Sequence, residues 1–167
     1  MKLNTVLGIV ATALVFVAGP ARAQTKANAG FEKLKTLMGE WDGKTEKGKP
    51  VRVSYRLVSA RTALLETLSS PDESEMVTVY HADGNRVALT HYCDANNQPR
   101  MRAEPPSGPI RQLAFNFGGA TNLAGPSTGH MHKLVVAFED KDHFTQRWTW
   151  RENGREVTEV FHFARKK

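Results

Sequence analysis

The sequence has very little cysteine, since Cys93 is the single one among 167 residues. One thiol cannot close a disulfide within the chain, so the fold must be stabilised by packing rather than by covalent cross-links. Long apolar runs are scarce as well. The one clear run, residues 6–19, is about 14 residues long and falls short of the ~20 that a membrane-spanning helix needs. A disulfide-rich scaffold is therefore excluded, and no membrane span is expected beyond this run.

Basic residues are in excess but do not cluster. Lysine and arginine number 23 against 17 acidic residues, which gives a formal net charge of +6. Nucleic-acid-binding domains normally carry a basic stripe with interleaved aromatic residues, whereas the densest basic run here is the terminal ARKK, residues 164–167. Nucleic acid is therefore not expected as a partner.

The N-terminus has the parts of a secretory signal peptide. Lys2 supplies a positive start, residues 6–19 form the apolar segment, and a small-residue motif ends at Ala23. Cleavage after Ala23 predicts a signal peptide over residues 1–23 and one mature domain over residues 24–167. The expected location is the periplasm or the outside of the cell.

One short helix is expected at the start of the mature chain. Phe31, Leu34 and Leu37 recur at helical spacing, Asn28 is a candidate N-cap, and Gly39 is a candidate stop. Beyond this point the apolar residues alternate with polar ones, which is typical of strands with one buried face.

Ten short strands are expected after the helix, separated by turn-forming stretches such as KGKP, SPDES, ADGN and ENG. They cover residues 40–46, 51–59, 62–69, 75–82, 86–93, 98–104, 110–117, 131–139, 143–151 and 155–165. Closing such a meander into a barrel removes the exposed strand edges. The predicted fold is therefore all-β, an antiparallel ten-stranded barrel capped at one end by the helix, with residues 118–130 as a long loop at one mouth.

The segment LKTLMGEWDGK, residues 34–44, carries a family resemblance. A helix running into glycine, tryptophan and glycine resembles the opening of the lipocalin and fatty-acid-binding (calycin) barrels, especially the nitrobindin-like ones. The segments TALLE, MVTVYHADG and LTHYCDANNQPRM resemble a bacterial domain family of unknown function with the same type of barrel. The resemblance implies that Trp41 closes one end of the barrel by packing.

The nitrobindin-like barrels also raise the question of haem. They bind haem through a histidine near the C-terminus, and His162 is the histidine of the last expected strand here. However, His162 lies between Phe161 and Phe163, so it faces solvent if these two phenylalanines fill the core. The resemblance therefore implies haem binding, but the alternation of inward and outward side chains along this strand does not support it.

Alternation indicates which polar side chains face the barrel interior. His91 shares the more apolar face of its strand with Val87 and Leu89, so it is expected to point inward. Gln146 shares one face with Trp148 and Trp150, which predicts an aromatic wall with a single amide.

Glu66 is less determined, because both faces of residues 62–68 carry leucine. It is either solvated on the outer face or buried inside. A buried carboxylate costs several kcal/mol unless it is paired, so Arg100 or Arg102 is the expected partner of an inward Glu66.

Two further groups of side chains suggest chemistry. Cys93 and His91 lie two residues apart on one strand, about 7 Å from each other, which is too far for the direct contact of cysteine catalysis. Cys93 is therefore expected to be a small buried hydrophobe. His130 and His132 are weak candidates for a zinc site, provided that His91 or Glu66 supplies a third ligand.

The predicted function is binding of a small, partly hydrophobic ligand in the barrel cavity, without a cofactor. The candidate ligand-binding residues are Glu66, His91, Arg100, Asn116, Gln146 and Trp148. Three alternatives stay open: a hydrolase or isomerase that uses His91 or Glu66 as acid or base, a haem- or metal-binding protein, and a scaffold that presents residues 118–130 to a protein partner. The sequence contains no strong catalytic motif.

Overall fold

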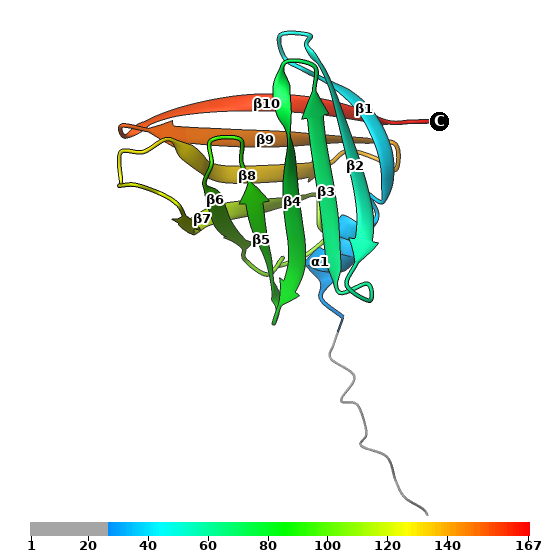
Figure 1. The fold of residues 1–167 in the computed structure, drawn as a ribbon. Coiled ribbons are helices and arrows are strands. Elements are labelled where there is room, and N and C mark those ends of the chain that lie inside the picture. Colours follow the sequence, from blue (N-terminus) through cyan, green and yellow to red (C-terminus); the bar gives the residue numbers. More distant parts are fainter. Residues whose placement is uncertain (1–26) are drawn as a thin grey trace, which may run out of the picture.

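The structure is a computed structural model that describes residues 27–167, so the expected signal peptide lies outside the described residues. Each strand pairs antiparallel with the next along the chain, and the first pairs with the last to close a barrel of ten strands. One short helix precedes the barrel (Figure 1). The predicted all-β fold is confirmed.

The elements follow the predicted order with small shifts at their ends. They are α1 (Ala29–Lys35), β1 (Gly39–Thr45), β2 (Pro50–Val58), β3 (Ala63–Ser70), β4 (Glu73–Asp83), β5 (Arg86–Tyr92), β6 (Gln98–Ala103), β7 (Gln112–Thr121), β8 (His130–Phe138), β9 (His143–Glu152) and β10 (Arg155–Arg165). The largest difference is in β7, which continues to Thr121 and shortens the expected loop over residues 118–130.

Helix α1 forms for local reasons and ends earlier than Gly39. The Asn28 side chain accepts a hydrogen bond of 2.9 Å from the Phe31 amide, as expected of an N-cap. After Lys35 the backbone tightens into three-residue turns, in which the Leu37 amide donates to the Leu34 carbonyl. The helix therefore fills barely two turns.

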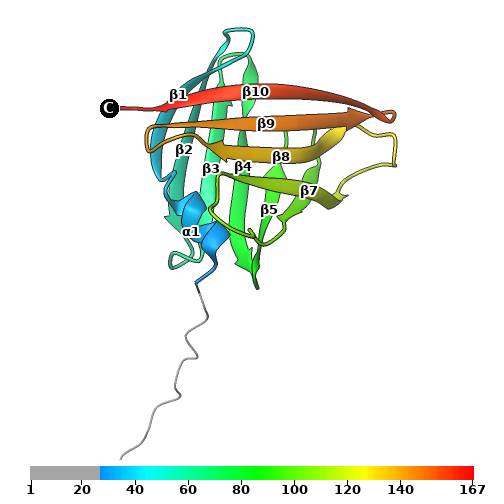
Figure 2. The same cartoon turned by 180° about the vertical axis from the view of Figure 1, so that it is seen from behind.

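Helix α1 covers one end of the barrel (Figure 2), and Trp41 of β1 is buried beside the turn that follows the helix. The buried Trp41 indole donates 2.7 Å to the Leu37 carbonyl and meets the Phe144 ring edge-on at 4.7 Å. From outside, the Arg165 guanidinium lies 4.0 Å from the Trp41 ring and donates to the Met38 carbonyl, so the last strand holds the helix in place. This end of the interior is solid with aromatic side chains.

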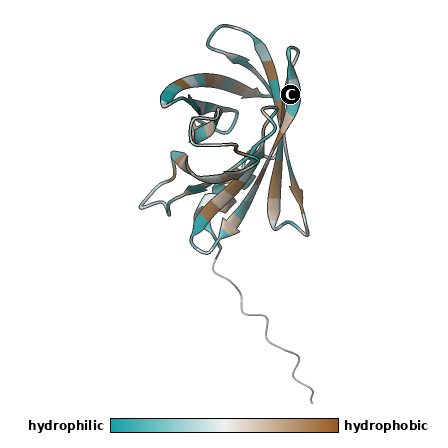
Figure 3. Cartoon of the chain, turned by 60° about the vertical axis from the view of Figure 1, so that its left-hand side comes forward, coloured by the Kyte–Doolittle hydropathy of each residue, from teal (hydrophilic) through white to brown (hydrophobic). Residues whose placement is uncertain are grey.

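The opposite end of the barrel is less tightly closed. The β7–β8 loop and the β9–β10 hairpin project together away from α1 (Figures 1 and 2). Along the strands, hydrophilic and hydrophobic segments alternate (Figure 3), because successive side chains point to opposite faces of the sheet. No helix within residues 27–167 has the length and apolarity needed to cross a membrane.

Candidate functional site

A cavity of about 450 Å³ occupies the barrel interior at the end away from α1. It lies between β3, β4 and β5 on one side and β8, β9 and β10 on the other. Its lining is mostly apolar: Leu68, Met76, Met131, Trp148, Trp150, Val157 and Phe161, together with His91, Cys93, Glu73, Asp94 and Glu159. Ligand cavities of proteins are typically of this size and have few polar groups among apolar ones.

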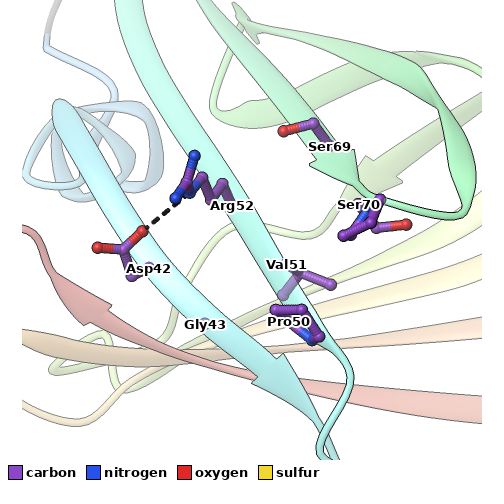
Figure 4. A pocket seen from close by; sticks show the side chains of 8 residues that line it. Asp42, Gly43, Pro50, Val51, Arg52, Ser69 and Ser70 are labelled. Atoms are coloured by element: carbon purple, nitrogen blue, oxygen red, sulfur yellow. Dashed lines mark ion pairs between the residues drawn. The ribbon is translucent and has the colours of Figure 1, made fainter.

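A second hollow is lined by residues of β1, β2 and β3 (Figure 4). Its polar side chains include Asp42 and Arg52, which form an ion pair of 3.3 Å while the Arg52 side chain stays 77% exposed. Such pairs contribute little energy, and none of the unpartnered buried polar atoms in the described part of the chain lies here. The interior cavity is therefore the better candidate site.

Glu66 on β3 points inward and is 0% exposed. Its Oε2 accepts hydrogen bonds of 2.8 Å from both the Tyr80 hydroxyl and the Gln146 amide. The expectation of an arginine partner is wrong: Arg100 and Arg102 are both exposed on the outer face of β6. Neutral donors thus satisfy the buried carboxylate.

Trp148 fixes the orientation of the Gln146 amide. The indole Nε1 donates 2.9 Å to the Gln146 Oε1, so the Nε2 of Gln146 is the donor end of the amide. That nitrogen donates both to Glu66 and, at 2.7 Å, to the Tyr55 hydroxyl. Both amide hydrogens of Gln146 are therefore donated, one to Glu66 and one to Tyr55.

Thr78 on β4 connects Glu66 to His91 on β5. Its Oγ1 lies 3.4 Å from the Glu66 Oε1 and 2.9 Å from the His91 Nδ1. The His91 ring in turn packs against the Trp148 ring, with centroids 4.6 Å apart. We call these five side chains, Glu66, Thr78, His91, Gln146 and Trp148, the buried network.

The second nitrogen of His91 ends the buried network in the cavity wall. His91 is 1% exposed, and its Nε2 has no hydrogen-bond partner among residues 27–167. Leaving a buried polar atom unsatisfied costs about 1–3 kcal/mol. A ligand that hydrogen-bonds to Nε2 would recover this free energy.

The charge of Glu66 and the tautomer of His91 are coupled through one hydroxyl. If the carboxylate is ionised, Thr78 donates to it and accepts from the Nδ1–H of His91, so Nε2 is a bare acceptor. If the carboxyl is neutral, its proton turns towards Thr78, Thr78 donates to Nδ1, and Nε2 carries the hydrogen. The Nε2 of His91 is therefore an acceptor or a donor according to the state of Glu66.

Burial dominates the ionisation of both end groups. It raises the pKa of the Glu66 carboxyl above its usual value, although hydrogen bonds from Tyr55, Tyr80 and Gln146 act the other way. It lowers the pKa of His91 to about 4. His91 is thus a neutral imidazole at pH 7.

Four of the six predicted site residues meet in this place: Glu66, His91, Gln146 and Trp148. Arg100 and Asn116 do not join them, because β6 turns Met101 inward and β7 turns Phe115 inward, which leaves both polar neighbours exposed. The prediction of Arg100 and Asn116 as site residues is therefore wrong, because successive side chains along a strand point to opposite faces of the sheet.

The prediction did not include Thr78 and Tyr80. Both lie on the inner face of β4 with the buried Met76. The alternation Met76, Thr78, Tyr80 was the available signal, since an inward hydroxyl needs a polar partner inside the barrel.

Cys93 lines the cavity but is poorly suited to act as a nucleophile. Burial raises the pKa of its thiol above the usual value. Its Sγ lies 3.7 Å from the Asp94 carboxylate, to which it donates. This geometry agrees with the expected role of a small buried hydrophobe.

His130 and His132 form a separate hydrogen-bonded pair beside Phe117. The His130 Nδ1 donates 2.8 Å to the Thr128 carbonyl, so its Nε2 accepts from the His132 Nδ1 at 3.2 Å. No group of three potential metal ligands forms within the described residues, and both His91 and Glu66 belong to the buried network instead. Zinc binding stays a prediction without a third ligand.

His162 is exposed on the outer face of β10, between the buried Phe161 and Phe163. Its imidazole therefore points away from the cavity, as the alternation predicts. The histidine that the family resemblance implies for haem does not fit an interior haem site.

Comparison with known proteins supports the fold. No protein-family profile and no curated protein matches the chain. Among solved structures, the chain is similar to the crystal structure of Rv2717c from M. tuberculosis, with a TM-score of 0.57 and 12% sequence identity, over 83% of this chain and 98% of that one. At this identity the similarity shows a shared barrel and nothing about the ligand.

Proposed function

We propose that this protein is an exported, calycin-type barrel that binds a small, partly hydrophobic molecule in its interior cavity. The observation that carries the proposal is the unpartnered His91 Nε2, which is buried in the wall of a cavity of about 450 Å³. The resemblance of residues 34–44 to the start of calycin barrels supports the family, and the signal-like N-terminus supports export.

The cavity wall suits a ligand with an apolar body and one hydrogen-bonding group. The partly exposed Trp150 offers flat apolar surface beside the buried Trp148, and Met76 and Met131 offer adaptable side chains. Rigid support comes from the buried network, since Gln146 and Glu66 hold Trp148 and His91 from behind. A site that is organised before binding loses less entropy when the ligand enters.

Acid–base catalysis is the second candidate, because Glu66, Thr78 and His91 form a path for a proton. A general base works best when its pKa lies near the operating pH. The pKa of His91 is lowered to about 4, which makes its Nε2 a weak base at neutral pH. The same nitrogen can still accept or donate a hydrogen bond to a ligand, so the geometry favours binding over catalysis.

Native mass spectrometry of the protein from its own host tests the proposal. We expect a bound small molecule on the wild type, which is lost or strongly reduced in His91→Phe. This substitution keeps an aromatic ring against Trp148 while it removes both nitrogens. His162→Phe is the matched control, because His162 is exposed, and it should retain the ligand. Wild-type protein that carries no ligand and binds none from host extract would contradict the proposal.

A further inference from the structure

The mouth of the interior cavity is acidic. Glu73 at the start of β4, Asp94 in the β5–β6 turn and Glu159 on β10 all line it. No lysine or arginine lines the cavity within residues 27–167. The whole chain has a formal net charge of +6, so the charge at the mouth is opposite in sign to the net charge of the chain.

These three carboxylates are exposed and free to meet a ligand. Within residues 27–167 none of them takes part in an ion pair, whereas Asp83 and Glu104, for example, are paired with arginines on the outer surface. Arg155 lies on β10, the strand of Glu159, but it does not line the cavity. Like charges at the rim of a cavity with apolar walls concentrate the field and attract the opposite charge.

The walls between the mouth and the buried network also favour a cation. Trp148 and Trp150 both line the cavity, and a tryptophan ring attracts a cation over its face. At the inner end, His91 is kept neutral by burial and adds no positive charge. The unpartnered Nε2 of this buried side chain, which lines the same cavity, is an independent observation in favour of a ligand.

We infer that the cavity selects organic cations, in which an apolar body lies inward along Trp148 and Trp150 and a positively charged amine stays at the mouth between Glu73, Asp94 and Glu159. A neutral alcohol of the same shape binds the other way round, with its hydroxyl at the His91 Nε2. This inference rests on the proposed function and adds the charge class of the ligand.

Isothermal titration calorimetry with three probes of one shape tests the inference. The probes are 1-naphthylmethylammonium, 1-naphthylmethanol and 1-naphthylacetate. We expect the ammonium to bind about tenfold more tightly than the alcohol, and the acetate to bind most weakly. The preference should shrink in 0.5 M NaCl, because salt screens exposed charges. The quaternary (1-naphthylmethyl)trimethylammonium should keep the preference, because charge rather than N–H donation is responsible.

Two triple variants locate the preference. Glu73→Gln/Asp94→Asn/Glu159→Gln should bring the ammonium down to the affinity of the alcohol and leave the alcohol unchanged. Glu32→Gln/Glu104→Gln/Glu139→Gln removes the same charge from exposed positions outside the cavity lining and should keep the preference. Circular dichroism checks that both variants fold.

The outcomes separate the two proposals. Equal binding of ammonium and alcohol, tighter binding of the acetate, or a preference that survives in the first triple variant would overturn the inference and leave the proposed function intact. Absence of binding for every probe would count against the proposed function itself, and the inference would fall with it.

Discussion

At the scale of single residues, His91 is a side chain that the fold alone does not explain. Its Nδ1 is bonded to Thr78 and its ring packs on Trp148, yet Nε2 is buried without a partner in the described chain. A barrel that was only a scaffold would have no need to keep the unsatisfied Nε2, which costs about 1–3 kcal/mol. The retained imidazole is therefore best understood as part of a binding site.

If His91 serves ligand binding, its replacement should weaken binding with little loss of stability. Replacing His91 by phenylalanine removes an unsatisfied buried nitrogen but also the 2.9 Å hydrogen bond to Thr78. The two effects oppose each other, so the free energy of unfolding at pH 7 should change by no more than about 1 kcal/mol in either direction, while affinity for 1-naphthylmethanol falls. Urea denaturation and calorimetry measure the two effects. A variant that is several kcal/mol less stable would show that the imidazole is there for structural reasons.

The depressed pKa of His91 gives a pH dependence with a defined sign. The unfolded chain protonates this histidine near its ordinary pKa of 6.5, and the folded chain only near 4. Between these values the unfolded state binds more protons, so the free energy of unfolding falls as the pH is lowered, by up to about 3 kcal/mol. The raised pKa of Glu66 acts in the opposite direction, because the folded state then holds its proton more tightly.

Comparison of wild type with His91→Phe at each pH isolates the contribution of His91. The difference in free energy of unfolding between the two proteins should grow from pH 7 to pH 4, and His162→Phe should show no such change. Equal pH profiles for wild type and His91→Phe would mean that His91 is not held neutral by burial.

Substitution of Glu66 by glutamine predicts a change in the tautomer of His91. The amide oxygen can accept from Tyr80 and Gln146, and the amide nitrogen then donates to Thr78, which must donate to the His91 Nδ1. Nε2 should therefore carry the hydrogen in Glu66→Gln, as nitrogen-15 spectra of the imidazole can show. An Nδ1–H signal in this variant would break the proposed path through Thr78.

At the scale of elements, strand alternation predicted the inner faces of β5 and β9, and with them His91, Gln146 and Trp148. It could not place Glu66, because Leu64 and Leu65 lie on opposite faces of the same strand. The error over Arg100 has a different cause. Glu66 is satisfied by Gln146, which lies 80 residues away in the chain, and pairing over that distance is invisible in a local pattern.

The β7–β8 loop is pinned to the barrel rather than free, and this gives a prediction at the same scale. The Gly129 carbonyl accepts 2.9 Å from Asn97, and a Cβ at Gly129 would lie 2.1 Å from the Trp150 ring. Gly129→Ala should therefore displace Trp150, lower the free energy of unfolding by about 1–3 kcal/mol and weaken ligand binding. Gly125→Ala in the same loop meets no atom within 4 Å and serves as the control.

Unchanged thermal stability and tryptophan fluorescence in Gly129→Ala would show that the β7–β8 loop moves to accommodate the added methyl group without displacing Trp150. In that case the loop would not fix the position of Trp150 in the cavity wall. The prediction thus tests whether the loop shapes the binding site.

At the scale of the whole molecule, the barrel has two unlike ends. Helix α1, Trp41 and Arg165 close one end with aromatic packing and hydrogen bonds. The other end opens through an acidic mouth to a cavity whose wall includes His91 and Trp148 of the buried network. The family-like sequence of residues 34–44 therefore belongs to the closed end, and the residues proposed for function belong to the open end.

A neutral ligand in the cavity is expected to hydrogen-bond to the His91 Nε2. Titration with 1-naphthylmethanol, followed by nitrogen-15 spectra of the histidine side chains at pH 7, measures this contact. We predict that the Nε2 signal of His91 moves strongly as the hydroxyl binds, while the signals of His162 stay fixed. Saturable binding that leaves the Nε2 signal of His91 unchanged would contradict the account.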